Sequence, residues 1–147
     1  MARHLFGTDG VRGRAGHFLT AELALKLART AATRLESQRP QVLIIRDTRE
    51  SGEMLESAIA AGVAAGGGDA WLAGVLPTPA APLLVKRYRF DLAAVISASH
   101  NPYRDNGIKF FGPDGFKLSD DAELAIEALL EDAPPPCIRA ITSIRDS

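Results

Sequence analysis

The chain has 147 residues, of which 46% are hydrophobic and 24% charged, the proportions of a soluble globular protein with its own core. Its 17 lysines and arginines are spread along the sequence and nearly balance 18 acidic residues, which indicates neither a nucleic-acid nor a membrane surface. Cys137, the single cysteine, cannot form an internal disulfide, and no long apolar run follows the N-terminus; both features favour a cytoplasmic protein without a membrane span.

Helical and strand patterns alternate along the chain. Residues 6–13 hold three glycines and no helical period, so we expect a loop or an edge strand there. A short, continuously apolar strand is predicted at 42–45, and further strands at 70–75 and 92–96. Four helices are predicted, one after Thr20 reaching Leu35, one after Ser51 ending at glycines 66–68, one opened by Thr78-Pro79 and reaching about Tyr88, and one after Ser119 with Ala122, Ala125, Ile126 and Leu129 facing inward.

Near the end of this series, Gly112-Pro113-Asp114-Gly115 is a turn signature between 107–111 and 116–118, which predicts an antiparallel hairpin. The whole order predicts an α/β fold: a three-layer domain with a mostly parallel mixed sheet, helices on both faces and one antiparallel hairpin. We place this domain at residues 1–132. Residues 133–147 contain a triple proline and no clear period, and we expect a linker, a disordered end or aberrant sequence.

The most informative stretch is 96–111, where an apolar strand gives way to two hydroxyls, an imidazole, an amide and a proline. Ligands of open α/β sheets gather beyond the carboxyl ends of strands. Ser99, next to His100 and ten residues before Lys109, is therefore a candidate nucleophile. The alternative is that Ser97 and Ser99 only satisfy backbone groups in a turn.

From about Leu5 to Leu130 the chain resembles the α-D-phosphohexomutases, most closely the bacterial phosphoglucosamine mutase branch. The resemblance is carried in the family's order by four segments, 6–13, 46–52, 76–80 and 96–111. The family usually has glycine where this chain has Ile45, a departure from the pattern that bears on local backbone geometry and touches no candidate catalytic residue.

The resemblance implies a role for each matching residue. Ser99 would be phosphorylated and would contact a metal through its phosphate, while His100, Asn101 and Arg12 would surround that phosphate. Lys109 would exchange a proton with a sugar hydroxyl. An arginine can give paired hydrogen bonds to phosphate, and a lysine close to other cations releases its proton more readily and can act as a base.

Some of these residues also have simpler interpretations. Arg12 and Lys109 could be ordinary surface cations. If 107–111 is a strand, however, Lys109 leaves the face that Ile108 and Phe110 bury. Asn101-Pro102 fit a turn, and Asn106-Gly107 are a typical turn pair that would start the hairpin.

For a complete enzyme, the resemblance implies an isomerase that interconverts glucosamine 6-phosphate and glucosamine 1-phosphate. The phosphoryl group would pass through the phosphoserine and a sugar bisphosphate, which is also the activator. One Mg²⁺ would be held mostly by an Asp-Gly-Asp-x-Asp-Arg loop in the second of four domains. Neither that loop nor the fourth domain's Arg-x-Ser-Gly-Thr clamp occurs in the sequence, so we expect domains II–IV to be absent and the chain alone to be inactive.

The expected partners are thus a phosphosugar and domains II–IV of the same enzyme, with a homo-oligomer left open and no nucleic acid or membrane. Two other functions remain as alternatives. The first is a solitary domain that binds a phosphosugar or a partner protein without catalysis. The second is a serine hydrolase using Ser99 and His100, which is disfavoured because the Gly-x-Ser-x-Gly elbow is absent around Ser99.

Overall fold

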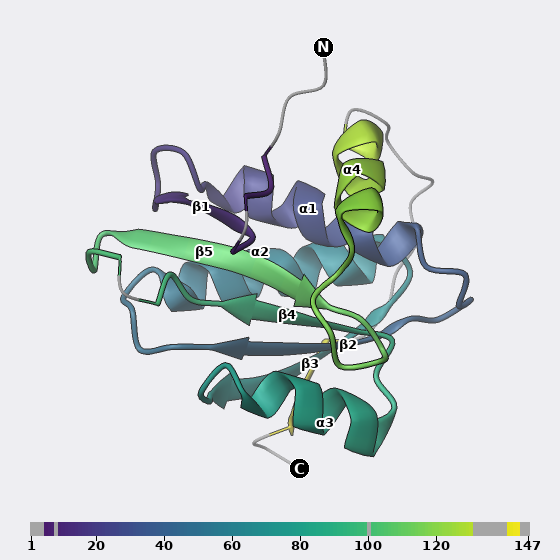
Figure 1. Cartoon of the computed structure of the whole chain (residues 1–147). Helices are drawn as coiled ribbons and strands as arrows, with labels where there is room; N and C mark the ends of the chain where they lie inside the picture. Colours follow the sequence, from purple (N-terminus) through teal and green to yellow (C-terminus); the bar gives the residue numbers. More distant parts are fainter. Residues whose placement is uncertain (1–4, 8, 100, 131–140, 145–147) are drawn as a thin grey trace.

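The computed structural model describes residues 5–7, 9–99, 101–130 and 141–144. The strands in these residues are β1 (Val11–Arg14), β2 (Gln41–Arg46), β3 (Asp69–Val75), β4 (Leu92–Ile96), β5 (Asp105–Phe111) and β6 (Ile141–Ser143). The helices are α1 (Ala21–Thr33), α2 (Gly52–Ala65), α3 (Ala80–Tyr88) and α4 (Asp120–Leu129). The strands form one mixed sheet in the order β1-β5-β4-β2-β3-β6 (Figure 1).

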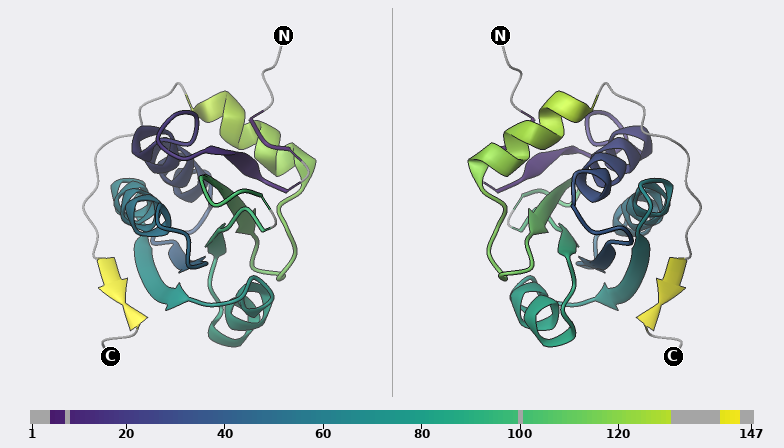
Figure 2. Two further views of the ribbon diagram at one scale, coloured as in Figure 1. Left: turned by 90° about the vertical axis from the view of Figure 1, so that its left-hand side faces the viewer. Right: turned by 90° about the vertical axis from the view of Figure 1, so that its right-hand side faces the viewer.

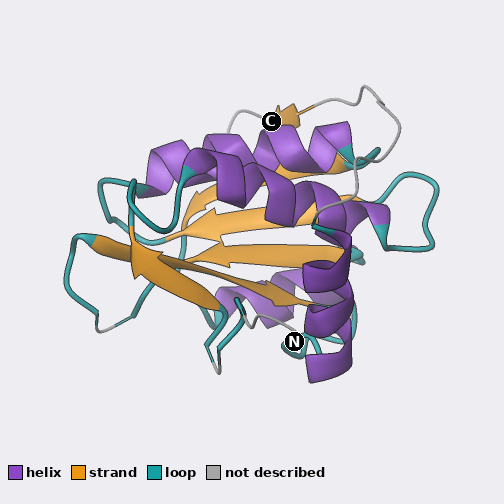
Figure 3. Ribbon diagram, turned by 90° about the horizontal axis from the view of Figure 1, so that it is seen from above, coloured by secondary structure: helices purple, strands orange, loops and turns teal. Residues whose placement is uncertain are grey.

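Helices cover both faces of this sheet, which confirms the predicted three-layer α/β fold. The helices α1 and α2 lie side by side on one face, and α3 lies on the other (Figures 2 and 3). On the α1/α2 side, Ile44, Ile96 and Phe110 belong to a buried cluster with Leu27 and Ile59. A smaller buried cluster on the α3 side joins residues of β2 and β4 to α3 and Phe90; its members are Leu43, Ile45, Ala81, Val85, Phe90, Ala93 and Val95. Burial of β2 and β4 on both faces explains their unbroken apolar sequences.

The sheet is parallel at one end and antiparallel at the other. Strand β2 pairs in parallel with β3 and β4, whereas β5 runs antiparallel to both β4 and β1. The predicted turn at 112–115 forms, with the Gly112 N–H donating to the Phe116 carbonyl at 2.9 Å. Its second arm pairs with β5 only through a bridge from Phe111 to Lys117 and a hydrogen bond from the Leu118 N–H to the Phe110 carbonyl at 3.1 Å, while β1 pairs with the first half of β5. The main antiparallel hairpin is therefore formed by β4 and β5, which pair over four residues each.

The helix starts agree with the sequence where a side chain supplies the cap. Thr20 and Ser119 each accept a hydrogen bond at 3.1 Å, from the backbone N–H of Leu23 and Ala122 respectively. Helix α3 differs from the prediction because Pro79 occupies the cap position itself and the helix begins at Ala80. At α2, the Ser51 hydroxyl makes no cap and accepts a hydrogen bond from Asn106 instead.

The predicted inward face of α4 was partly wrong. Ile126 is fully buried, but Ala125 and Leu129 are exposed, and Glu123 is buried with its carboxylate 2.8 Å from the Lys117 ammonium. Helix α4 lies beside α1 toward the β5 side of the domain (Figure 1), so only a narrow stripe of it meets the core. The ion pair with Lys117 makes burial of Glu123 tolerable.

Sequence reasoning did not predict β6, which lies within 133–147. Three residues of β6 pair in parallel with β3, from Ala70–Ile141 to Leu72–Ser143. The boundary at residue 132 stays a prediction. In the ranges described above, no helix has the length and apolar character needed to cross a membrane.

Candidate functional site

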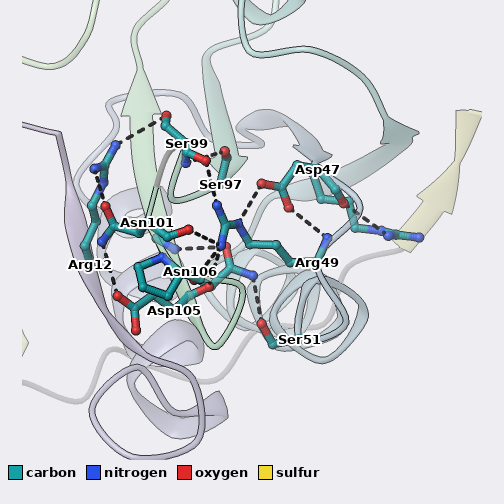
Figure 4. Close-up of polar contacts among 12 residues, drawn as sticks. Arg12, Asp47, Arg49, Ser51, Ser97, Ser99, Asn101, Asp105 and Asn106 are labelled. Carbon is teal, nitrogen blue, oxygen red and sulfur yellow. Dashed lines mark hydrogen bonds and ion pairs between the residues drawn. The ribbon is translucent and has the colours of Figure 1, made fainter.

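The candidate site lies where β2 and β4 end. Because these strands are parallel, their carboxyl ends meet at the same edge of the sheet, where ligands of such folds bind. The connection from β4 to β5 (97–104) and the segment after β2 (47–51) lie side by side there, next to β1 (Figure 4). The hydrogen bonds between them define the site.

Ser99 has an unusual backbone conformation. Its φ of 53° lies in the left-handed region, which non-glycine residues seldom occupy. The Ser97 hydroxyl accepts a hydrogen bond from the Ser99 N–H at 3.1 Å, and the Asn101 N–H donates to the Ala98 carbonyl at 3.0 Å. The connection thus closes into a tight turn with Ser99 inside it. Such strained residues cluster at functional sites.

Arg12 reaches this turn from β1. Its guanidinium donates to Asn101 Oδ1 at 3.3 Å and to Ser99 Oγ at 3.4 Å, and it lies 3.9 Å from a carboxylate oxygen of Asp9. These contacts are longer than a strong charge-assisted hydrogen bond, which measures about 2.7–2.9 Å. The guanidinium therefore keeps donor capacity for a further acceptor close to Ser99.

Lys109 occupies the opposite face of β5 from the main core. Ile108 and Phe110 are buried against α1 and α2, while Lys109 is half-buried, as strand alternation predicts. The residue two positions earlier, Gly107, lies on the same face as Lys109, and Arg12 packs across it. Lys109 and Arg12 therefore rise from one face of the sheet. Within the described ranges, no hydrogen bond or ion pair occupies the Lys109 ammonium.

The structure changes the interpretation of Asn106-Gly107. These residues lie inside β5 and do not form a turn. Asn106 is fully buried and donates to the Ser51 hydroxyl at 2.9 Å, which ties β5 to the start of α2. Gly107 is needed because a Cβ there would lie 2.7 Å from the Ser97 carbonyl oxygen and 2.9 Å from Arg12 Cγ. Both residues favour turns locally, but here long-range contacts select a strand.

The structure therefore brings Ser99, Arg12 and Asn101 into direct contact and places Lys109 on the same face as Arg12. His100, the remaining predicted site residue, lies outside the described residues.

Comparison with known proteins identifies the family of this domain. A family model for the α/β/α domain I of phosphoglucomutase/phosphomannomutase matches residues 3–135. The chain belongs to this family.

Individual relatives of this phosphohexomutase domain agree. The phosphoglucosamine mutase of Cereibacter sphaeroides (strain ATCC 17025 / ATH 2.4.3) is 55% identical over 134 residues, which cover 88% of this chain and 30% of that protein. The phosphoglucosamine mutase of Chelativorans sp. (strain BNC1) is 52% identical over 134 residues, covering 89% and 30%. A crystal structure described as a phosphomannomutase from Thermus thermophilus superposes with a TM-score of 0.83 at 28% identity, covering 97% of this chain and 33% of that one. The chain thus spans about a third of the length of these relatives.

Phosphohexomutases generally depend on Mg²⁺, so the donor set matters. In the described parts of this domain, no three His, Cys, Asp or Glu side chains lie close enough together to hold a metal ion. The carboxylates nearest the turn are engaged, since Asp47 pairs with Arg49 and Asp105 accepts from Asn101. These described residues do not by themselves fit a magnesium site.

Sequence reasoning missed one prominent residue of the phosphohexomutase site. Arg49 lies in the family segment 46–52 but was not predicted as a site residue, yet its guanidinium contacts three backbone carbonyls of the turn and that of Asp105 at the start of β5. The available signal was an arginine and an aspartate together at the carboxyl end of a buried strand. That pattern predicts a polar cluster but does not indicate which backbone carbonyls the arginine binds.

Proposed function

We propose that this chain is domain I of a phosphosugar mutase, and that Ser99 carries the phosphoryl group by which the complete enzyme interconverts glucosamine 6-phosphate and glucosamine 1-phosphate. The observation that carries the proposal is the placement of Ser99 at the carboxyl end of β4, in a left-handed turn with its hydroxyl 3.4 Å from the Arg12 guanidinium. The identity to phosphoglucosamine mutases, 52–55% over 134 residues, supports this substrate.

In the proposed reaction, phosphoserine 99 transfers its phosphoryl group to a free hydroxyl of the sugar phosphate. The bond from phosphorus to Ser99 Oγ breaks while a bond to the sugar oxygen forms, and Lys109 carries the hydroxyl proton from the sugar oxygen to the departing Ser99 Oγ. In the second transfer the Ser99 hydroxyl oxygen attacks the other phosphoryl group of the sugar bisphosphate, the bond from that phosphorus to the sugar oxygen breaks, and Lys109 carries the serine hydroxyl proton to the sugar oxygen released. The chain ends as phosphoserine again, with the phosphate moved on the sugar.

The other predicted residues support this transfer by position and charge. Arg12 would stabilise negative charge on the phosphoryl oxygens, with Asn101 holding its guanidinium and His100 adding a further polar group beside the phosphoserine. Charge stabilisation and positioning supply most of the catalysis of phosphoryl transfer. Domains II–IV of the complete enzyme would contribute the magnesium ligands and the residues that select the sugar.

A chimera tests this proposal. This chain supplies its matched 134-residue segment to the Cereibacter sphaeroides phosphoglucosamine mutase, and conversion of glucosamine 6-phosphate is measured with a coupled assay. We expect turnover, phosphate on Ser99 by mass spectrometry, and a loss of about 10³-fold or more in Ser99→Ala because that variant lacks the oxygen proposed to carry the phosphoryl group.

Ser97→Ala is the matched control, because it removes the other hydroxyl of the same turn, which accepts a hydrogen bond from the Ser99 N–H. The Ser97 hydroxyl is expected to carry no phosphate, so phosphate should remain on Ser99 in this variant. Full activity in Ser99→Ala would reject Ser99 as the phosphorylated residue. An inactive chimera, together with tight binding of glucosamine 6-phosphate to the 147-residue chain without magnesium, would favour the noncatalytic binding domain.

A further inference from the structure

We propose that Arg49 is a positioning residue that fixes the Ser99 turn in its left-handed, reactive conformation by binding the backbone carbonyls on the inner side of the turn. The proposal rests on the proposed function, because it concerns how the residue that carries the phosphoryl group is held. Arg49 would touch neither sugar nor phosphate.

The contacts of Arg49 are concentrated on one short segment. Its Nη2 donates to the Ser99 carbonyl at 2.7 Å. Its Nη1 donates to the carbonyls of Asn101, Pro102 and Asp105 at 3.1, 2.8 and 3.3 Å, so its two hydrogens are shared among three acceptors. The Ser99, Asn101 and Pro102 carbonyls lie between the two strands, outside the sheet ladder, and the Pro102 carbonyl also accepts from the Asp105 N–H at 2.9 Å. One guanidinium can bind several such carbonyls because its donors point in fixed, diverging directions.

Arg49 is in turn anchored to the sheet. Its Nε lies 3.0 Å from Asp47 Oδ2, and its own N–H donates to Asp47 Oδ1 at 3.1 Å. The Asp47 N–H donates to the carbonyl of Ile96, the last residue of β4, at 3.0 Å. The Arg49 side chain is only 11% exposed, and the Asp47 carboxylate offsets the cost of burying its charge. Through Arg49 and Asp47, the turn is thus connected to the carboxyl ends of both β2 and β4.

Arg49 and Arg12 contact the turn at different groups. Arg49 holds backbone carbonyls from the inner side, whereas Arg12 meets the Ser99 hydroxyl from the β1 side (Figure 4). A non-glycine residue in the left-handed region persists only where its surroundings fix it. The 2.7 Å bond to the Ser99 carbonyl is the contact best placed to do so, because it acts on the peptide group that follows the strained φ.

The test compares Arg49→Lys and Arg49→Met with Arg46→Lys. Lysine keeps the charge but lacks the planar fork. Arg46 is a matched control: it is comparably buried at 13% exposure and ends β2, three residues before Arg49. It pairs with Glu53 and Glu56 on α2 and donates to the Asp47 carbonyl at 3.5 Å, but has no hydrogen bond to the carbonyls that Arg49 binds. Amide hydrogen exchange in the 147-residue chain is followed by NMR at Ser99, Asn101 and Asp105 and, as a reference, in the centre of β2. Steady-state kinetics are measured in the chimera described above.

Both Arg49 variants are expected to lower protection of the three turn amides about tenfold or more, with β2 unchanged. In the chimera, kcat should fall about 100-fold while KM for glucosamine 6-phosphate changes less than about threefold, since misplacing a reactive group by about 1 Å costs that much. Arg46→Lys should leave the turn amides and kcat near their original values. Asp47→Asn, which keeps Arg49 but removes its carboxylate anchor, should reproduce the pattern more weakly.

Three results would overturn the proposal: retained turn protection and kcat in Arg49→Lys, an equal loss of protection throughout the domain, or a change in KM alone. If the Arg49 variants do not fold, Asp47→Asn decides by the same criteria. If the unsubstituted chimera does not isomerise its substrate, the proposed function fails, and the exchange experiment still shows whether Arg49 holds the turn.

Discussion

At the scale of single residues, Gly107 shows how the sheet makes room for the site. Arg12 must cross β5 to reach Ser99, and it does so over the one position of β5 that has no side chain. The Cβ of any other residue there would lie 2.7 Å from the Ser97 carbonyl oxygen and 2.9 Å from Arg12 Cγ. The Ser97 carbonyl belongs to backbone at the strand end and cannot move away without disturbing the turn.

We therefore predict that Gly107→Ala destabilises the chain by about 1–3 kcal/mol, the usual cost of overpacking. The same change should displace the Arg12 side chain, seen as shifted amide resonances at Ser99 and Asn101. Urea unfolding and ¹⁵N NMR measure the two effects. Gly7→Ala is the control, because a Cβ there would be 3.7 Å from its nearest neighbour, an ordinary contact; equal losses in both variants would contradict the argument.

At the scale of elements, α4 shows that a helical pattern does not fix how much of a helix is buried. Its apolar residues fit a broad stripe, but the helix lies at the side of the domain against α1 and meets the core mainly through Ile126. Leu129 on the predicted face is 37% exposed, and the ion pair between Glu123 and Lys117 replaces part of the expected apolar contact.

Two truncations on this helix test that description. Ile126→Ala should cost about 2–5 kcal/mol of unfolding free energy, because it removes a fully buried side chain. Leu129→Ala should cost about 1 kcal/mol or less, since that side chain remains partly solvated. Chemical denaturation of both variants measures these two losses of unfolding free energy. A larger loss in Leu129→Ala than in Ile126→Ala would show that α4 buries the face predicted from the sequence.

At the scale of the whole molecule, the core is complete before the last described strand. Every large, fully buried side chain in the described ranges lies between Leu19 and Ile126, on both faces of the sheet. The strand β6 adds three paired residues at the β3 edge, and Ile144 packs half-buried against the α3-side cluster. The domain should therefore tolerate loss of residues 133–147.

We predict that a chain ending at residue 132 folds cooperatively with an unchanged far-ultraviolet circular dichroism spectrum. Its unfolding free energy should fall by about 1–2 kcal/mol, from the partial burial of Ile144 and a few edge hydrogen bonds. Urea titration of the 147-residue and truncated chains measures this difference. Loss of the cooperative transition would show that β6 belongs to the folding unit and that the boundary at 132 is wrong.

The sequence by itself determined the features that depend on neighbouring residues. The alternating strands and helices, the caps at Thr20 and Ser119, and the position of the Ser99 turn after a buried strand are all encoded within windows of about ten residues. The order of these elements then restricted the fold to a three-layer α/β sheet, and the family motifs pointed to Ser99, Arg12, Asn101 and Lys109.

Only the tertiary structure decided features that depend on distant partners. Asn106-Gly107 became strand because Ser51 and Arg12 contact them, and α4 buried a narrow stripe because of its place beside α1. The contacts of Arg49 with the Ser99 turn join groups about 50 residues apart, so no local pattern contains them. Hydrogen-bond partners across such separations are fixed only when packing of the whole sheet brings the chain segments together.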